Sequence, residues 1–470
     1  MEVCIIAEGS YPYVSGGVSS WINQLASEMK DVKFKVLSIM PSREDNLEYK
    51  YKLQDNIIEI KTIYLNDYLY LNPFKKVKEP KLSNIEKIQV EKFLRFEKDV
   101  DWNIVLSTIS NKKTFGDCIQ FFKSKFFWEM ILSIYKDGYE GQEFNSFFWT
   151  LRSMFLTFIN ILQNDVPKAD IYHSVSTGYA GLMGILAKIR YNKPLVLTEH
   201  GVYAREREEE IIKATWVTGI YKQFWIDFFY FISIGTYKTS NIVVSLFERN
   251  RQIQLELGSS EEKTMVIPNG VDIKRFSMEH EETSTFNVGA VLRIVPIKDV
   301  KTLIRAFKLV KGDIENSKLY LMGPYDEDKV YYEECVRLIK NLRLEEVVII
   351  TGKVDVKEYV KKMNVLVLTS ISEGQPLVIL EGMSSGIPFV STDVGSCKEL
   401  LEGKEDDAIG PCGIITPPVS PRETYKAIGK LFNDKDLRMK MRGNGRKRVE
   451  KYYTKELFIN SYKKIYRDLR

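Results

Sequence analysis

Two glutamates stand where the sequence changes from a buried strand to a helix. The segment reads TSISEGQPLVILEGM over residues 369–383, with Glu373 before the turn and Glu381 eight residues later. Pro376 can open the helix, because the N–H that proline lacks has no partner at that position. The helix N-terminus then presents unpaired N–H groups and the positive end of its dipole to an anion. Glu373 can bind sugar hydroxyls and Glu381 a ribose; alternatively, both are acids favoured near a helix start.

Two basic residues flank a second loop of the same kind. Arg293 and Lys298 lie in VLRIVPIKD (residues 291–299), after one strand and before a helix that Asp299 can cap. Two fixed cations there would neutralise a diphosphate and stabilise the charge that develops as it leaves. The alternative is a pair of solvated surface charges.

A glycine pair precedes the first expected helix. Gly16 and Gly17 would let the backbone approach a phosphate closely at the helix N-terminus. The sequence here does not show the six-residue glycine fingerprint of dinucleotide-binding folds, which disfavours a nicotinamide-dependent oxidoreductase.

The three histidines are too few for a histidine-rich metal site. His200 directly follows an expected strand, where the active-site groups of such sheets lie. His173 lies in or at the end of a strand, either as a functional group or as a hydrogen-bonded core histidine. His280 falls in a charged stretch and is expected to be exposed.

Pairs of acids separated by one residue could bind a divalent metal. They occur at Asp99/Asp101, Asp326/Asp328 and Asp434/Asp436. Such pairs are common by chance, and none ends a strand in the expected crevice. We expect no essential metal and no cofactor, because Arg293, Lys298 and helix dipoles can supply the positive charge.

Composition limits the class of protein. The chain has 470 residues, 44% of them hydrophobic, and a net charge of +5 from 68 basic and 63 acidic residues. This length predicts at least two domains, and the small basic excess excludes a typical nucleic-acid binder but suits anionic small ligands or lipid surfaces. The five scattered cysteines favour a reducing cytoplasm. Residues 1–8 read as a buried strand rather than a signal peptide.

Short apolar runs alternate with helical patterns at both ends of the chain, which predicts an α/β fold of βαβ units with parallel sheets. Strands are expected at residues 3–7, 33–39, 170–175, 195–198, 241–245 and 263–267, and then at 286–292, 318–322, 347–351, 365–369 and 388–391. We expect two doubly wound, Rossmann-like domains facing across a crevice. The first covers residues 1–276 with a large insertion at about 42–168, the second covers 277–449, and a C-terminal helix at about 450–470 crosses back to the first.

Two aromatic-rich stretches need separate consideration. Residues 144–162 contain Arg152, and residues 218–235 contain Lys222 and Asp227, so both are too interrupted by charge for a clean membrane span. Buried amphipathic helices are the simpler interpretation; a membrane-surface or partner-facing role is the other.

Together these motifs resemble those of the retaining family 4 glycosyltransferases of the GT-B fold. Glu373 and Glu381 match that family's pair of glutamates, and Arg293 and Lys298 match its phosphate-binding pair. The segments AEGSYPYVSGGVSSW (7–21), TEHG (198–201), PIKD (296–299) and EGQP (373–376) are closer still to the PelF branch, the cytoplasmic transferases of Pel-type exopolysaccharide synthesis. The chain departs from the broader family at Gln375, Gly382 and Asp299, and the first of these leaves the donor sugar open.

The resemblance implies a role for each matching position. Glu373, Gly374 and Gln375 would bind the donor sugar and Glu381 the ribose. Arg293, Lys298 and amides near Gly17 and Leu377 would hold the diphosphate, and backbone near Lys353 and Val354 the base. His200 would contact the donor sugar and lie near the acceptor, with Tyr11, Tyr13 and His173 on the acceptor side.

The activity that the resemblance implies is retaining transfer of a hexose, of the glucose or N-acetylhexosamine type, from a UDP-sugar to an acceptor hydroxyl in exopolysaccharide synthesis. The partners would be the UDP-sugar, a saccharide or polymer acceptor and a membrane polymer-export complex at the inner face of the cell membrane, but no nucleic acid. A glycoside hydrolase, which also uses two carboxylates, and a non-catalytic nucleotide-sugar scaffold are the alternatives.

Overall fold

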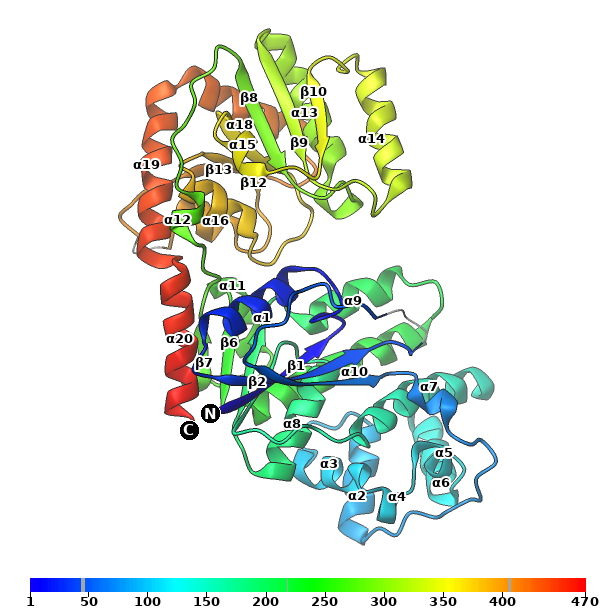
Figure 1. Ribbon diagram of the computed structural model, residues 1–470. Coiled ribbons are helices and arrows are strands. Elements are labelled where there is room, and N and C mark those ends of the chain that lie inside the picture. Colours follow the sequence, from blue (N-terminus) through cyan, green and yellow to red (C-terminus); the bar gives the residue numbers. More distant parts are fainter. Residues whose placement is uncertain (44–46, 218, 405–406) are drawn as a thin grey trace. The chain divides into compact units, whose positions relative to one another are not determined.

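The computed structural model describes residues 1–43, 47–217, 219–404 and 407–470, which form two compact units. The first unit contains Met1–Ser245, Asn250–Val266 and Lys463–Arg470, and the second contains Leu246–Arg249 and Ile267–Tyr462. Each unit has one parallel sheet with helices on both of its faces (Figure 1).

The first sheet has seven strands in the order β3-β2-β1-β4-β5-β6-β7, all parallel. The strands are β1 (Glu2–Glu8), β2 (Lys33–Met40), β3 (Ile57–Tyr64), β4 (Ile171–Ser174), β5 (Leu195–Glu199), β6 (Ile242–Ser245) and β7 (Thr264–Val266). The central strands are continuous runs of buried residues, as expected when helices cover both faces. The order reverses between β1 and β4, and ligands of such sheets bind at the carboxyl ends of strands at this point.

The second sheet has six parallel strands in the order β10-β9-β8-β11-β12-β13. They are β8 (Phe286–Val291), β9 (Ser317–Met322), β10 (Val348–Gly352), β11 (Val365–Leu368), β12 (Phe389–Thr392) and β13 (Gly413–Thr416). Here the reversal lies between β8 and β11, which places the loops after these two strands at one edge of the sheet.

The helices follow the strands in chain order. Those of the first unit are α1 (Gly17–Glu28), α2 (Asn84–Leu94), α3 (Trp102–Ser110), α4 (Lys112–Phe115), α5 (Cys118–Phe122), α6 (Lys125–Gly138), α7 (Phe144–Leu162), α8 (Tyr179–Tyr191), α9 (Tyr203–Lys213) and α10 (Ile220–Thr239), followed by α11 (Glu248–Glu256), which begins in the second unit. Those after β7 are α12 (Ile273–Phe276), α13 (Val300–Asp313), α14 (Lys329–Asn341), α15 (Val356–Val360), α16 (Leu377–Ser384), α17 (Cys397–Glu402), α18 (Pro421–Asn433), α19 (Lys435–Tyr452) and α20 (Lys455–Asp468). Short 3₁₀ helices are η1 (Asp67–Tyr70), η2 (Glu261–Lys263) and η3 (Pro296–Lys298).

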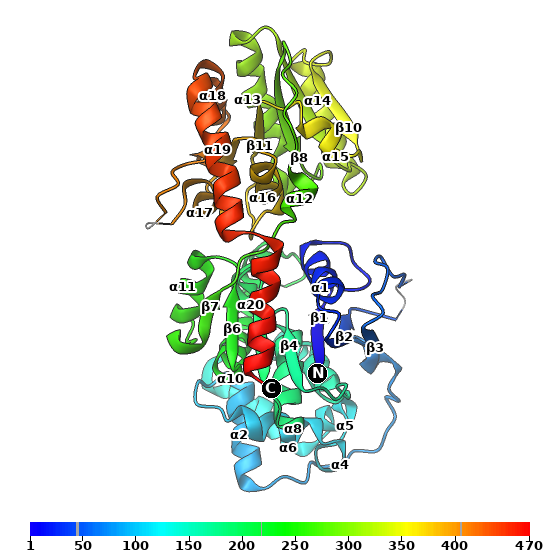
Figure 2. The same ribbon diagram turned by 60° about the vertical axis from the view of Figure 1, so that its left-hand side comes forward.

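The region expected to be one insertion is partly sheet. β3 at Ile57–Tyr64 pairs with β2 and forms the edge of the first sheet, so the added helices, α2 to α7, begin only after it. They gather as one group in both views (Figures 1 and 2). Their buried aromatic side chains share a core with α8 and α10.

The two aromatic-rich stretches are the helices α7 and α10, and the C-terminal half of each is buried on nearly all sides. Residue 218, where the second stretch was expected to start, lies outside the described residues. Over the described part of the chain, no helix is both long and apolar enough to span a membrane.

The division between the units differs from the boundary expected at residue 277. The long segment of the second unit starts at Ile267, directly after β7. The charged stretch 277–285 packs within this unit: the Glu281 N–H donates to the Lys361 carbonyl at 2.8 Å.

The C-terminal helix returns to the first unit, as the sequence predicted. α20 starts in the second unit, and residues from Lys463 onward belong to the first. There the Tyr466 hydroxyl lies 2.6 Å from His173 Nδ1 on β4.

Candidate active site

Lys298 and Glu373 form an ion pair at the carboxyl edge of the second sheet. Lys298 ends η3 in the loop after β8, and Glu373 lies in the loop after β11. Lys298 Nζ donates to Glu373 Oε1, and the Ser370 hydroxyl donates to the same oxygen at 2.6 Å. The two charged side chains are only 18% and 12% exposed. The structure thus brings together the two charges that the sequence placed on neighbouring loops.

Backbone contacts hold these two loops in register. The Thr369 hydroxyl is 3.1 Å from the carbonyls of both Lys298 and Asp299, and the Ile371 N–H donates to the Ile297 carbonyl at 2.8 Å. Asp299 has a left-handed backbone (φ 42°), and its carboxylate caps α13 by accepting from the Thr302 N–H at 3.3 Å. The expected cap is therefore present, and it fixes the end of the Lys298 loop.

A glycine supports the Glu373 loop from behind. Gly395 has φ +53°, and a Cβ atom there would lie 2.2 Å from the Glu373 carbonyl oxygen and 2.3 Å from that of Gly374. The next residue, Ser396, donates its N–H to the Gly374 carbonyl at 3.0 Å. Only glycine allows this close approach of two backbone segments.

The N-terminus of α16 is open. Pro376 is its N-cap and provides no side-chain cap, so the helix begins at Leu377, one residue later than expected. The first N–H groups of a helix, here those of Leu377 and Val378, have no intrahelical partner. They and the helix dipole make a site for an anion beside the Lys298–Glu373 pair.

Arg293 is not drawn into this pair. Its Nη1 lies 2.6 and 2.7 Å from the two carboxylate oxygens of Glu327, and both side chains are about half exposed. Lys353 is exposed just after β10. Val354 packs against the apolar cluster that includes the buried side chains of α16.

Glu381 lies in α16 among apolar side chains. It shares a small cavity with Phe276, Val291 and Val378, and no described residue hydrogen-bonds its carboxyl group. Burial raises the pKa of Glu381 to about 7, against the opposing effect of Arg275. A hydrogen-bond donor that contacts this carboxyl group would therefore lower its pKa and favour loss of the proton.

Gln375 has a structural role that the motif did not reveal. Its Oε1 accepts from the Asn269 N–H at 2.6 Å, and its Nε2 donates to the Leu246 carbonyl at 3.4 Å. The buried side-chain amide therefore ties down two other backbone segments of the second unit, and is not free to face a donor sugar.

In the first unit, Gly16 and Gly17 begin α1 with an open end. Gly16 is the N-cap without a side-chain hydrogen bond, and both glycines are exposed with open space where a Cβ would lie. Tyr51 bridges the turn through its hydroxyl, 3.3 Å from the Gly16 N–H. Of the two tyrosines expected on the acceptor side, Tyr11 is fully buried, and the Tyr13 hydroxyl bonds Thr62 Oγ1 at 2.7 Å.

His173 on β4 and His200, which directly follows β5, differ in their surroundings. His173 is fully buried, with Nδ1 on Tyr466 and Nε2 2.8 Å from Thr198 Oγ1, and burial lowers its pKa to about 3. Both ring nitrogens are occupied, so this is a core histidine with no group left for an acceptor. His200 packs edge-on against Trp21 at 5.1 Å, and burial lowers its pKa to about 4. Its Nε2 is buried and has no hydrogen-bond partner among the described residues.

Two carboxylates that the sequence analysis did not select hold the loop after β5. Glu8, the last residue of β1, accepts from the Tyr203 hydroxyl at 2.9 Å and the Ala180 N–H at 3.2 Å. Glu199, the last residue of β5, accepts from the Tyr203 N–H at 3.0 Å and the Tyr237 hydroxyl at 2.6 Å. Burial raises the pKa of both. An acid ending a buried strand is the signal that could have identified them.

One acid of each pair caps a helix. Asp101, Asp328 and Asp434 are the N-caps of α3, α14 and α19, each accepting backbone N–H groups. His280 is half-buried rather than exposed, with Nδ1 2.7 Å from the Lys361 carbonyl. Within the described ranges, no three His, Cys, Asp or Glu side chains come together as metal ligands.

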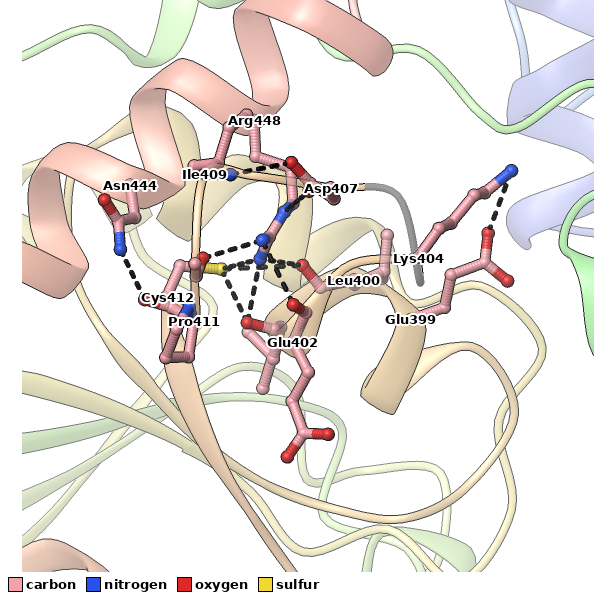
Figure 3. A network of polar contacts seen from close by, with 12 residues as sticks. Glu399, Leu400, Glu402, Lys404, Asp407, Ile409, Pro411, Cys412, Asn444 and Arg448 are labelled. Atoms are coloured by element: carbon pink, nitrogen blue, oxygen red, sulfur yellow. Dashed lines mark hydrogen bonds and ion pairs between the residues drawn. The ribbon is translucent and has the colours of Figure 1, made fainter.

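Arg448 on α19 lies at the centre of a network of polar contacts in the second unit (Figure 3). Its guanidinium is fully buried and pairs with Asp407 at 2.8 Å. It also donates to carbonyls of α17 and the chain leading into β13, including Leu401 at 2.8 Å and Gly410 at 2.7 Å. Burial alone would raise the pKa of Asp407, but the Ile409 N–H and Arg448 outweigh it and lower that pKa. α17, which starts beside Gly395, is thereby fixed to α19.

Comparison with known families covers both units. Residues 1–262 match the family described as "Domain of unknown function (DUF3492)". The chain belongs to the DUF3492 family. Its residues 273–448, which include both site loops of the second unit, match "Glycosyl transferases group 1".

Individual relatives of this DUF3492 protein are distant. It is 26% identical over 236 residues to the capsular polysaccharide biosynthesis glycosyltransferase CapM of Staphylococcus aureus, covering 48% of this chain and 57% of that protein. It is 28% identical over 313 residues to the uncharacterized glycosyltransferase MJ1178 of Methanocaldococcus jannaschii, covering 66% and 78%. The chain thus spans little more than half of the first of these relatives.

Solved structures share the fold of this DUF3492 protein. The Anabaena protein Alr3699/HepE in complex with UDP aligns over 100% of both chains with a TM-score of 0.63 at 15% sequence identity. The two Rossmann-like parallel-sheet units, with the C-terminal helix returning to the first, are the architecture expected for the GT-B fold.

Proposed function

We propose that the chain is a retaining glycosyltransferase that moves a hexosyl group from a UDP-sugar to an acceptor hydroxyl. The supporting observation is the Lys298–Glu373 pair beside the open N-terminus of α16. A cation, a carboxylate and free backbone N–H groups at one strand edge fit a ligand that carries a diphosphate next to hydroxyls. The second unit matches the group 1 glycosyl transferases, and we assign their activity to it as part of this proposal.

The donor would replace contacts that the protein now makes with itself. A diphosphate would take Lys298 from Glu373 and Arg293 from Glu327, and would accept from the N–H groups of Leu377 and Val378. The freed Glu373 carboxylate would accept hydrogen bonds from the donor sugar. The uncharged ribose hydroxyls would suit Glu381, and backbone near Lys353 and Val354 would meet the base.

Catalysis would rest on stabilising the departing diphosphate. The bond between the sugar C1 and the phosphate oxygen breaks, and its electrons go to the diphosphate, where Lys298 and the α16 N–H groups neutralise the charge. The acceptor oxygen bonds to C1 on the same face, and its proton passes to the leaving diphosphate oxygen. No enzyme nucleophile is needed, and the configuration at C1 is retained. His200, neutral because burial lowers its pKa to about 4, would accept a hydrogen bond from a saccharide hydroxyl.

The comparisons support a UDP-sugar and a polysaccharide context. The structural neighbour Alr3699/HepE was also solved with UDP-glucose (TM-score 0.61, 15% identity), and CapM is named for capsular polysaccharide biosynthesis. We therefore propose a UDP-linked hexose of the glucose or N-acetylhexosamine type as donor, and a role in exopolysaccharide synthesis. No divalent metal would be required.

The test is turnover of UDP-glucose and UDP-N-acetylglucosamine with saccharide acceptors in the presence of EDTA. The proposal predicts acceptor-dependent UDP release and a product whose anomeric configuration, read by NMR, matches that of the donor. Inverted product would contradict the retaining mechanism. Hydrolysis of an oligosaccharide without nucleotide would favour a glycoside hydrolase, and UDP-sugar binding without turnover on any acceptor would favour a scaffold.

A further inference from the structure

Large apolar side chains lie exposed on the helices added after β3. Phe74 is 89% exposed, Trp149 on α7 is 58% exposed and Trp128 on α6 is 46% exposed. We call the surface formed by residues 72–81, the start of α6 and the first half of α7 the insertion face. A phenylalanine exposed to this degree gains nothing from burial within this chain, so an external apolar partner would stabilise it.

The parts of the insertion face are joined to one another. Glu79 accepts from the N–H groups of Lys125 at 2.7 Å and Phe126 at 3.3 Å, which places residues 72–81 along the N-terminus of α6. Lys123 Nζ also donates to the Pro73 carbonyl, next to Phe74. From α6 the surface continues to α7, because the Trp128 ring lies 6.0 Å from that of Phe148, the neighbour of Trp149.

Positive charge concentrates on the same surface. Residues 72–81 hold four lysines and one acid, and so do residues 112–125, which gives each segment a formal charge of +3. Residues 112–125 adjoin the insertion face, because Lys78 Nζ donates to the Lys113 carbonyl at 2.7 Å and Lys75 Nζ lies 2.5 Å from Asp117 Oδ2. Together the two segments exceed the +5 of the whole chain, while residues 126–143 between them and α7 hold four acids and one lysine and carry −3. Arg152 adds a cation over the Trp149 ring, 5.2 Å from its centre.

We infer that the insertion face docks on an anionic lipid bilayer. Tryptophan and phenylalanine side chains partition to the boundary between headgroups and acyl chains, and nearby lysines bind anionic headgroups. Because the face is positively charged, it would repel the same face on a second copy of the chain. The proposed contact is with the membrane surface, through this face.

The test is flotation of the full chain with vesicles of phosphatidylcholine alone and of equal parts phosphatidylcholine and phosphatidylglycerol. We expect binding to the anionic vesicles only, and a loss of binding in 1 M salt. The double variant Lys76→Glu/Lys78→Glu should lower the partition coefficient at least about tenfold, since each cation near an anionic surface contributes about 1 kcal/mol. Trp149→Ala should lower it several-fold through lost insertion.

A matched control is Trp216→Ala, which removes a tryptophan 67% exposed but outside the insertion face. It should bind anionic vesicles as the wild type does. Equal binding to both kinds of vesicle, no binding to either, or an equal loss in Trp216→Ala and Trp149→Ala would each overturn the inference. Circular dichroism and the melting transition of every variant show whether it is folded.

Discussion

At the residue scale, Lys298 and Glu373 are 75 positions apart in the sequence, yet they meet at one sheet edge. Their pairing could be predicted because each follows a buried parallel strand, and such loops converge. The sequence could not predict which hydrogen-bonding side chains already have partners within the protein. His173 and Gln375 lie in motifs that suggested ligand contacts, but their polar atoms are taken by Tyr466, Thr198 and backbone groups from distant segments.

Replacing either member of the pair should abolish most turnover without unfolding the protein. We expect Lys298→Ala and Glu373→Gln each to lower kcat about 10²- to 10³-fold, because each removes a charge that would act on the donor. The measurement is UDP release with the acceptor that the wild type uses, alongside the melting transition.

Lys301→Ala is the matched control for this prediction. It breaks an ion pair between α13 and α14, where Lys301 Nζ lies 2.5 Å from Glu334 Oε2, and it leaves Lys298 and Glu373 in place. Its turnover should stay within about twofold of the wild type. If Lys298→Ala or Glu373→Gln also kept wild-type rates, the role assigned to that residue would be wrong.

Glu381 should make stability depend on pH. Its folded pKa of about 7 lies above the ordinary value of 4.5, so the folded state holds the proton more tightly. The contribution of this proton to the free energy of unfolding is fully present below pH 4.5 and is lost as pH rises through 7. Between these values the free energy of unfolding of wild type should fall relative to Glu381→Gln by about 3 kcal/mol. Urea unfolding at pH 4, 6 and 8 measures this difference, and parallel pH slopes in the two proteins would contradict it.

At the scale of elements, the buried strands were predicted to within about a residue, as with β1 and β11. Their continuous apolar runs identify them. β3 and β13 were missed. In β3, Glu59 and Lys61 alternate with apolar residues as in an edge strand, so it lacks the continuous apolar run that identified the others. α3 and α6 were missed although the buried residues of each recur at helical spacing, as Val105, Leu106 and Ile109 do in α3, and α4 and α5 are too short to show a helical period.

Gly395 should be intolerant of any side chain. Gly395→Ala would put a methyl group against two carbonyl oxygens of the Glu373 loop and strain a positive φ. We expect displacement of Glu373 and at least about tenfold weaker UDP-sugar binding. The control Gly429→Ala places its methyl group in open space on α18 and should bind normally, with unchanged or slightly raised stability. Equal affinity in the two variants, measured by calorimetry, would show that Gly395 does not position the site.

At the scale of the whole molecule, two parallel-sheet units and the returning C-terminal helix could be predicted from the alternation of strands and helices and the resemblance. The exact division could not, because the charged stretch 277–285 looks like a linker but packs within the second unit. A hydrogen bond from Glu281 to Lys361 leaves no trace in the local sequence pattern. The same holds for the buried Arg448, which reads in sequence as one more surface cation on a basic helix.

The central claim is that the second unit holds a UDP-sugar donor. Calorimetric titration of the full chain with UDP, UDP-glucose, UDP-N-acetylglucosamine, GDP-mannose and NAD, without added metal, tests it most directly. The account predicts selective binding of UDP and of a UDP-sugar, with loss of both in Lys298→Ala. Folded protein that binds none of these nucleotides, or that binds NAD in preference to UDP, would contradict it.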